Sequence, residues 1–149
     1  MAVDVKQIKQ LRSETKAGIV EVKKALTETN GDMAKAKEWL VKRGLDKAAK
    51  KADRETGDGW IGSYVHGGKV AALVKLSCET DFVAKTDDFQ DLAREIAMQV
   101  ASMNPESVEE LLKQNYIRDS KKTIEDLVKE GIAKMGENIV VSEMIRMAI

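Results

Sequence analysis

One stretch of the sequence decides the fold: residues 60–78, WIGSYVHGGKVAALVKLSC. Its first seven residues are typical of a strand, with Ile61 and Val65 on one face. Gly67-Gly68 is a two-residue signal for a tight hairpin turn. From Lys69 onward, apolar side chains recur at every second position, which predicts a second strand with one buried face. That face carries Val70, Ala72, Val74, Leu76 and Cys78.

The residues after this hairpin predict helices and one more strand. Thr86 is placed to cap a helix, Asn104-Pro105 separates it from a shorter one, and Thr123 with Asp126 resembles a capping box. The last of these helices ends at Gly136, and residues 139–149 are rich in Ile, Val and Met, as in a strand. The pattern predicts an α+β core, in which a three-stranded antiparallel sheet packs with helices.

The residues before the hairpin predict a compact three-helix bundle. Asp4 and Asp32 are placed as N-caps, and Asn30-Gly31 marks a turn. Gly44 is expected to close the third helix as a left-handed C-cap residue. Apolar residues at helical spacing supply the bundle's core: Val5, Ile8 and Leu11, then Ile19, Val22, Ala25 and Leu26, then Met33, Ala36, Trp39 and Leu40. Helices this short need one another to persist, and bundles of this size commonly bind other proteins.

Charge divides the chain into two parts. Residues 1–56 hold 14 Lys and Arg against 9 Asp and Glu, whereas residues 57–149 hold 11 against 16. We therefore expect a domain of residues 1–54 and a second domain of residues 55–149. The basic stretch 42–54 has two interpretations, an RNA-contacting helix or a solvated linker helix. It lacks aromatic side chains for base stacking, which favours the linker.

The whole composition argues against several classes of protein. The chain has 25 Lys and Arg against 25 Asp and Glu, so we expect neither direct nucleic-acid binding nor membrane-surface binding. A single cysteine, Cys78, and a single histidine, His66, exclude an internal disulfide and a Cys/His zinc site. There is no apolar run long enough to span a membrane and no signal-peptide pattern at the N-terminus, so a cytoplasmic location is expected.

Enzyme motifs are also lacking, and we expect neither catalytic residues nor a cofactor or metal. Gly67-Gly68-Lys69 lacks the spacing of a phosphate-binding loop and fits a hairpin turn better. His66 has no nucleophile context, and Cys78 lies on the apolar face of a strand, where a buried thiol is expected. Asp87-Asp88 opens a helix, where two acids favour the helix dipole rather than a metal.

Three segments resemble the bacterial translation elongation factor Ts family. The first is Leu11–Thr15 (LRSET), which Gly18-Ile19 and residues 23–26 (KKAL) follow. The second is Cys78–Lys85 (CETDFVAK), and the third is Gly136–Val141 (GENIVV). The resemblance covers essentially the whole chain, in the family's order and spacing, and it is to the short form with one core subdomain. Three residues depart from the family's pattern. Lys16 stands where glycine is usual, Lys75 where glutamate is usual, and Ser77 where asparagine is usual.

The resemblance implies a guanine-nucleotide exchange factor for elongation factor Tu. It implies that the N-terminal bundle has a ubiquitin-associated-like fold and docks on the nucleotide domain of that GTPase. It also implies that the core intrudes beside the nucleotide, disturbs the Mg²⁺ site of the partner, and forms a homodimer. The partner-binding residues that it implies are Leu11, Arg12, Thr15, Gly18 and Ile19 in the bundle, and Thr80, Asp81, Phe82 and Val83, which also displace Mg²⁺, in the core.

Some alternatives remain at the level of sequence. Phe82 is either an exposed wedge or a core residue at the start of the next helix. A non-catalytic adaptor for a peptide or ubiquitin-like partner, and a small enzyme built on the α+β half, are the competing functions. Independently of the family, a three-stranded sheet in so short a chain leaves unpaired edges and a poorly covered face. Apolar residues 139–149 would offer that sheet to a symmetric partner, so a homodimer is expected.

Overall fold

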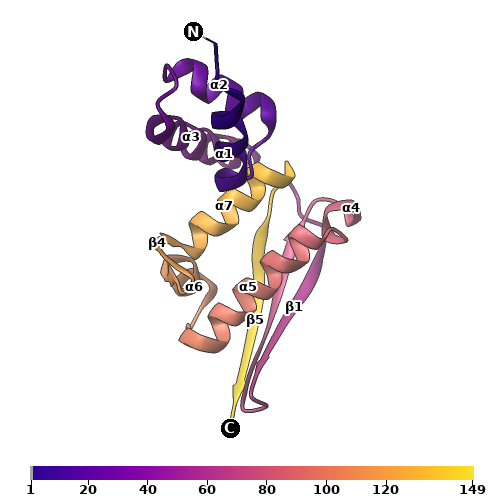
Figure 1. Ribbon diagram of the computed structural model, residues 1–149. Helices are drawn as coiled ribbons and strands as arrows, with labels where there is room; N and C mark the ends of the chain where they lie inside the picture. The colour runs from indigo at the N-terminus through magenta and orange to yellow at the C-terminus, as the bar shows by residue number, and fades with distance from the viewer. Residues whose placement is uncertain (1) are drawn as a thin grey trace.

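The computed structural model describes residues 2–149 and has the α+β architecture that the sequence predicts. A module of helices at the N-terminal end stacks on a core made of a sheet and helices (Figure 1). The long third helix is shared by the two parts. No helix within the described residues is both long and apolar enough to cross a membrane.

The N-terminal module contains α1 (Val5–Thr15), α2 (Ile19–Glu28) and the first part of α3 (Met33–Lys51). The predicted caps are confirmed, because the carboxylates of Asp4 and Asp32 accept hydrogen bonds from backbone N–H groups of the first turns they precede. The apolar faces of the three helices meet in a small hydrophobic cluster. Its buried members are Ile8, Leu11, Val22, Ala25, Leu26 and Ala36.

The predicted role of Gly44 is wrong. α3 continues for seven residues beyond it and ends at Lys51. Gly44 instead lies where α3 passes α7 (Ile124–Met135), and a Cβ added to it would lie 3.3 Å from the Cβ of Ala133. The missing side chain lets the two helices approach each other. In the sequence alone, a glycine at such a contact looks the same as a glycine at a helix end. Four residues later, Ala48 is buried in the hydrophobic cluster of the core.

The core sheet has the strand order β1-β2-β5 and is antiparallel throughout. β1 (Asp58–His66) and β2 (Val70–Cys78) form the predicted hairpin, and Gly67 and Gly68 both adopt the left-handed conformation in its turn. The connection has three residues rather than the predicted two, because His66 pairs with Val70 and Lys69 belongs to the turn. β5 (Val140–Ala148) pairs with the other edge of β2 and carries a bulge opposite Lys75 and Leu76. The alternating apolar residues of β2 face the helices, as predicted.

Within residues 2–149, helices cover one face of this sheet and leave the other open. α5 (Asp87–Met103) lies closest, and a Cβ added to Gly62 would meet the backbone of Ala93 at 2.5 Å, so only glycine fits between this helix and β1. α6 (Val108–Lys113) and α7 complete the layer, and both hydrogen bonds of the capping box predicted for Thr123 and Asp126 are present. The opposite face leaves its apolar side chains in solvent: Ile61, Val65, Leu73, Ile145 and Met147.

Two small elements were not predicted. β3 (Asn115–Tyr116) and β4 (Asp119–Thr123) form a polar hairpin, which the fully buried side chain of Gln99 holds by bonding to Asn115 O and Ile117 N. Strands this short and polar have no hydrophobic period to detect. The second is the one-turn helix α4 (Asp81–Ala84), which occupies the segment between β2 and α5.

Candidate partner-binding site

The one-turn helix α4 projects from the core at the junction of β2 and α5 (Figure 1). Thr80 is its N-cap, and its hydroxyl accepts a hydrogen bond from Val83 N at 3.4 Å. At the other end, the hydroxyl of Thr86 donates to Val83 O at 2.7 Å, and it also caps α5. Two threonine hydroxyls therefore define both ends of the turn.

Phe82 lies on this turn and is highly exposed, with 83% of its surface in solvent. The alternative in which Phe82 is a core residue is therefore wrong for the isolated chain. That core position belongs to Phe89, which is fully buried on α5. The turn is anchored instead by Ala84, which is buried, and by Val83, which packs partly against the core. Removing an exposed phenylalanine ring from water is favourable, so a partner that buried this ring would gain binding free energy.

Asp81 stands beside Phe82 at the start of the turn and is also exposed. Its carboxylate forms an ion pair with Lys85, with 3.1 Å between Oδ2 and Nζ. Both side chains are largely in solvent, so this pair contributes little to stability and can exchange for another cation. The turn therefore presents a carboxylate and an aromatic ring side by side.

Glu137 is a functional candidate that the residue-by-residue reasoning missed. It lies in the connection between α7 and β5, and its carboxylate accepts hydrogen bonds from the backbone and side chain of Thr80. The signal was present, because Glu137 belongs to the segment Gly136–Val141 that resembles the family. Behind the turn, the Cys78 thiol is buried and donates to Thr80 O. Burial raises the pKa of this thiol, and the charge of Glu137 adds to the effect, so the thiol stays protonated.

The candidate residues of the N-terminal module gather where α1 ends and α2 begins. Arg12 and Gly18 are exposed, and Gly18 serves as the N-cap of α2. Ile19 is also exposed, as is Val20, an apolar neighbour that the sequence reasoning did not single out. Leu11 and Thr15 support this surface from within. Leu11 is fully buried, and the Thr15 hydroxyl donates to its carbonyl oxygen at 2.7 Å.

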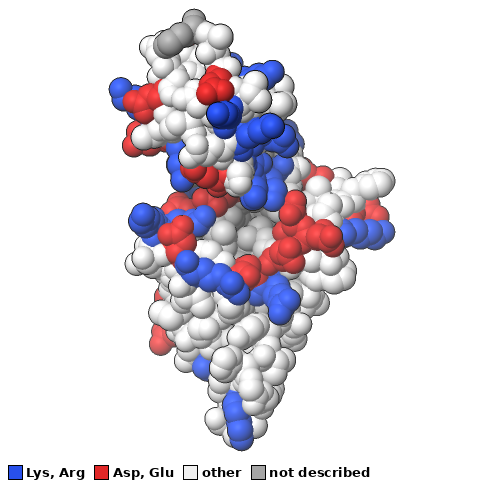
Figure 2. All heavy atoms as spheres, viewed as in Figure 1, with Lys and Arg blue, Asp and Glu red and all other residues white. Residues whose placement is uncertain are grey.

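The structure thus places the candidate residues in two groups. One group lies on the N-terminal module, and the other, residues 80–83, lies on the core (Figure 1). Figure 2 shows Lys and Arg side chains gathered at the base of the N-terminal module, with Asp and Glu side chains next to them on the core.

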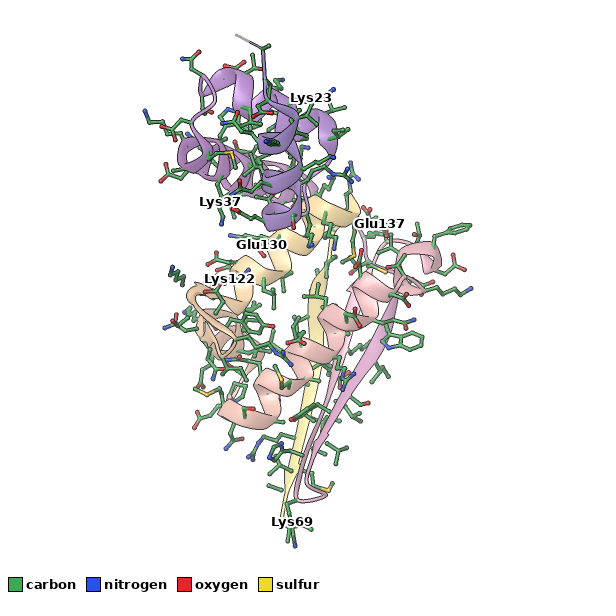
Figure 3. The ribbon with its side chains drawn as sticks, in the orientation of Figure 1. Lys23, Lys37, Lys69, Lys122, Glu130 and Glu137 are labelled. Atoms are coloured by element: carbon green, nitrogen blue, oxygen red, sulfur yellow. The ribbon has the colours of Figure 1, made fainter. Side chains whose placement is uncertain are left out.

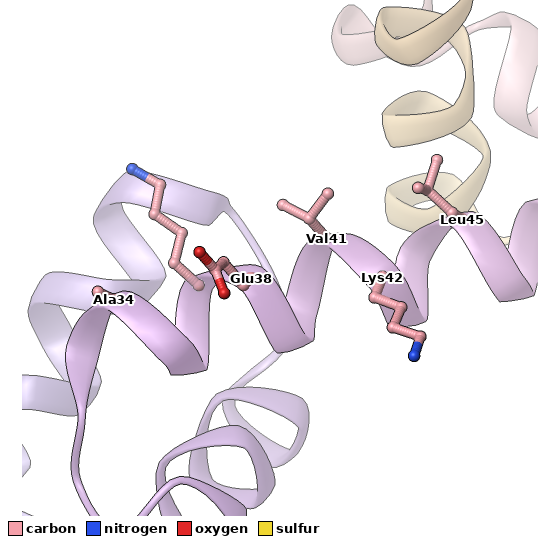
Figure 4. A pocket seen from close by; sticks show the side chains of 6 residues that line it. Ala34, Glu38, Val41, Lys42 and Leu45 are labelled. Atoms are coloured by element: carbon pink, nitrogen blue, oxygen red, sulfur yellow. The ribbon is translucent and has the colours of Figure 1, made fainter.

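Other features of the described chain offer little chemistry. His66 is exposed at the end of β1, where its Nδ1 lies 3.0 Å from the Tyr64 hydroxyl. A surface recess runs along α3 (Figure 4), lined by Ala34, Lys37, Glu38, Val41, Lys42 and Leu45. These side chains are aliphatic or point into solvent, so they do not form a convergent polar site. Within residues 2–149, no three His, Cys, Asp or Glu side chains are grouped as metal ligands would be.

Comparison with known proteins gives a consistent result. A family model described as "Elongation factor TS" matches residues 79–149. The chain is 40% identical to the elongation factor Ts of Oleidesulfovibrio alaskensis, covering 97% of the chain and 96% of the relative. It is 43% identical to that of Coprothermobacter proteolyticus, with 98% of each covered, and 41% identical to that of Thermosipho melanesiensis, with 99% and 98% covered.

These alignments also show a difference in length. The first extends over 191 positions, but the chain has 149 residues, so at least 42 positions (191 less 149) are gaps in this chain. The chain therefore matches these relatives over nearly their full length, and it is shorter than they are within the aligned region.

Proposed function

Because this chain belongs to the elongation factor Ts family, and so is a translation elongation factor, we propose that it is the guanine-nucleotide exchange factor for elongation factor Tu. It promotes release of GDP by inserting the segment Thr80–Val83 near the nucleotide and the Mg²⁺ site of that GTPase. The observation that carries the proposal is the exposure of Phe82 beside Asp81 on a turn capped at both ends.

The chemistry of the turn suits this role. A GTPase holds its nucleotide through backbone amides around the phosphates and through Mg²⁺. The Asp81 carboxylate can disturb the polar shell around that cation. The Phe82 ring can enter an apolar crevice and hold the displaced form open. Burying such a ring contributes roughly 1.5–3 kcal/mol, which corresponds to about 10- to 150-fold in an equilibrium constant.

The mechanism requires no covalent chemistry, catalytic residue or cofactor from this chain, so the chain is not an enzyme in the ordinary sense. It acts by binding, and linkage then applies in both directions. If the exchange factor lowers the affinity of the GTPase for nucleotide by some factor, nucleotide lowers the affinity of the GTPase for the exchange factor by the same factor. Exchange follows because a second nucleotide can enter the open GTPase and displace the factor.

The N-terminal module supplies the affinity in this proposal. Arg12, Gly18 and Ile19 form an exposed surface that docks on the nucleotide domain of the GTPase, while Leu11 and Thr15 hold that surface in shape. The protein acts in the cytoplasm, without direct contact with nucleic acid or membrane. The adaptor alternative has no observation in its favour beyond the bundle itself, and the small-enzyme alternative has none.

We also propose that the protein is a homodimer. The uncovered face of the core sheet carries Leu73 in its centre and Ile145 directly opposite on β5, both exposed. An apolar sheet face in water is unfavourable, and a second copy of the same face would cover it symmetrically.

The deciding experiment follows a fluorescent guanine nucleotide as it leaves purified elongation factor Tu. We expect the wild-type chain to accelerate release. With Phe82→Ala the rate of release should be about tenfold or more lower than with wild type, since the open form of the GTPase loses a buried ring. The variant should melt within about 0.5 kcal/mol of wild type, because the ring is exposed in the free protein.

Ile117→Ala is the matched control, because it removes an exposed apolar side chain from the β3–β4 hairpin. We expect wild-type exchange from this control. Normal release with folded Phe82→Ala would refute the wedge, and a wild-type chain that leaves the release rate unchanged would refute the exchange function.

A further inference from the structure

Glu137 joins two parts of the core that are far apart in sequence. Its Oε1 accepts hydrogen bonds from Glu79 N at 3.2 Å and Thr80 N at 3.0 Å, and its Oε2 accepts one from the Thr80 hydroxyl at 2.7 Å. Figure 3 shows Glu137 where the end of α7 meets the base of the α4 turn. One side chain thus receives three hydrogen bonds from two consecutive residues.

The position of these donors gives the contact its importance. The pairing of β2 with β1 ends at Cys78, so the next two N–H groups lie beyond the strand pairing. A carboxylate is a strong acceptor for such groups. The Thr80 hydroxyl donates to Glu137 and also accepts from Val83 N, so the carboxylate, the cap and the first turn of α4 form one chain of hydrogen bonds. Fixing Thr80 therefore fixes the direction in which Asp81 and Phe82 project.

The neighbouring residue, Asn138, strengthens the anchor. Its buried amide donates to the carbonyl oxygens of Ala52 and Arg54, at 3.3 Å and 2.9 Å, just beyond the end of α3. Arg54 in turn forms an ion pair with Glu79, with 3.7 Å between Nη1 and Oε1. The loop that carries Glu137 is thus held in place itself, so its carboxylate is a fixed acceptor.

We propose that Glu137 is a positioning residue for exchange: it holds the Thr80–Phe82 segment in the orientation that presents the aromatic ring and the carboxylate to the partner. This inference rests on the proposed exchange function. Glu137 acts through the turn and need not touch the nucleotide. Its loss therefore lowers the maximal rate of nucleotide release, while the concentration of factor needed for half-maximal rate, set largely by the N-terminal surface, changes little.

The first test uses the free protein and needs no partner. Amide hydrogen exchange, measured by NMR, reports on the Glu79 and Thr80 N–H groups directly. In Glu137→Ala both amides should exchange about tenfold faster or more, because their acceptor is gone. Glu137→Gln keeps one carbonyl oxygen without the charge and should give an intermediate effect. Glu130→Gln is the control: Glu130 lies within α7, two turns before Glu137, and its carboxylate binds Lys122 rather than the α4 turn (Figure 3).

The second test measures nucleotide release from elongation factor Tu as a function of factor concentration. We expect the maximal rate to fall about tenfold for Glu137→Ala and less for Glu137→Gln, with no change for Glu130→Gln. In a Phe82→Ala background, Glu137→Ala should cause little further loss, because the group that it positions has been removed.

Several results would overturn the proposal. Protected Glu79 and Thr80 amides in Glu137→Ala would show that the carboxylate does not anchor the turn. Faster amide exchange with an unchanged maximal rate would show that the anchor has no part in exchange, as would a full Glu137→Ala effect in the Phe82→Ala background. If Glu137→Ala does not fold, Glu137→Gln decides by the same measurements. A wild-type chain without exchange activity would refute the proposed function and the role of Glu137 in it, while the amide measurement would still decide whether the anchor exists.

Discussion

Lys16 ends α1 in the left-handed conformation, with φ 57° and ψ 12°, and its backbone N–H bonds to Arg12 O. Glycine adopts this conformation without a Cβ penalty, whereas other residues are strained by about 1 kcal/mol or more. The resemblance to the family already singles out this position, because the family usually has glycine where this chain has Lys16. The structure supplies the physical reason: the site is a C-cap.

Replacing Lys16 by glycine should therefore stabilise the protein. We expect Lys16→Gly to raise the free energy of unfolding by about 0.5–1 kcal/mol, the strain relieved less the extra chain entropy of glycine. Lys16→Ala is the control, since it removes the charge and keeps the Cβ. Urea unfolding of the three proteins is the measurement. Equal midpoints for the glycine and alanine variants would contradict the explanation.

The same scale shows what the sequence reveals about the candidate site. The segment Thr80–Val83 could be found from its resemblance alone, because four residues of one turn carry no period of their own. Phe82 and Phe89 each lie near the start of a helix, and only the structure shows that Phe89 is buried and Phe82 exposed. Glu137 could not be connected to Thr80 by spacing, since the contact joins residues 57 apart.

Among the elements, α3 differs most from its prediction. The other long helices begin and end as their caps and apolar periods predict, but the sequence predicts a helix end at Gly44, which lies within α3. Two physical situations favour glycine in a helical segment, a left-handed C-cap and a close helix contact. The sequence around Gly44 does not separate them, because the decisive neighbour, Ala133, lies on a distant helix.

A large side chain at Gly44 should push α3 away from α7. We expect Gly44→Leu to lower the free energy of unfolding by about 1–3 kcal/mol, despite the better helix propensity of leucine. Ala49→Leu places the same side chain on an exposed position of the same helix and should leave stability nearly unchanged. Thermal melts compare the two variants. A Gly44→Leu protein as stable as wild type would show that the helices do not pack closely at this point.

For the molecule as a whole, the sequence predicts the sheet with its buried face and the bundle with its caps. Both follow from local patterns, the period of two and the period near 3.6. The boundary between residues 54 and 55 remains a prediction. The change in net charge supports this boundary. However, α3 lies before the boundary and yet packs on α7, and Ala48 of α3 is buried in the core, so helix packing joins the two parts.

The uncovered sheet face gives the prediction that belongs to this scale. We expect the wild-type protein to sediment as a dimer at micromolar concentration, and Ile145→Glu to sediment as a monomer, because a charge would lie on the apolar face beside Leu73. Ile145 pairs with Leu73 and is 59% exposed in the single chain. Ile117→Glu, on the β3–β4 hairpin, is the control and should stay dimeric. A fully active wild-type monomer of 16.5 kDa would contradict the dimer.

The uninterrupted course of α3 has a consequence for avidity. The helix has 19 residues, so it spans about 28 Å, and it runs unbroken from the N-terminal module to its contact with α7 in the core. Once one surface of such a molecule is bound, the other is held at a fixed distance, and its effective concentration at a matching site is high. At any other spacing that concentration falls to almost zero. A partner that changes the distance between its two contact regions would therefore lose the second contact, and the affinity of the complex would fall to that of the first contact alone.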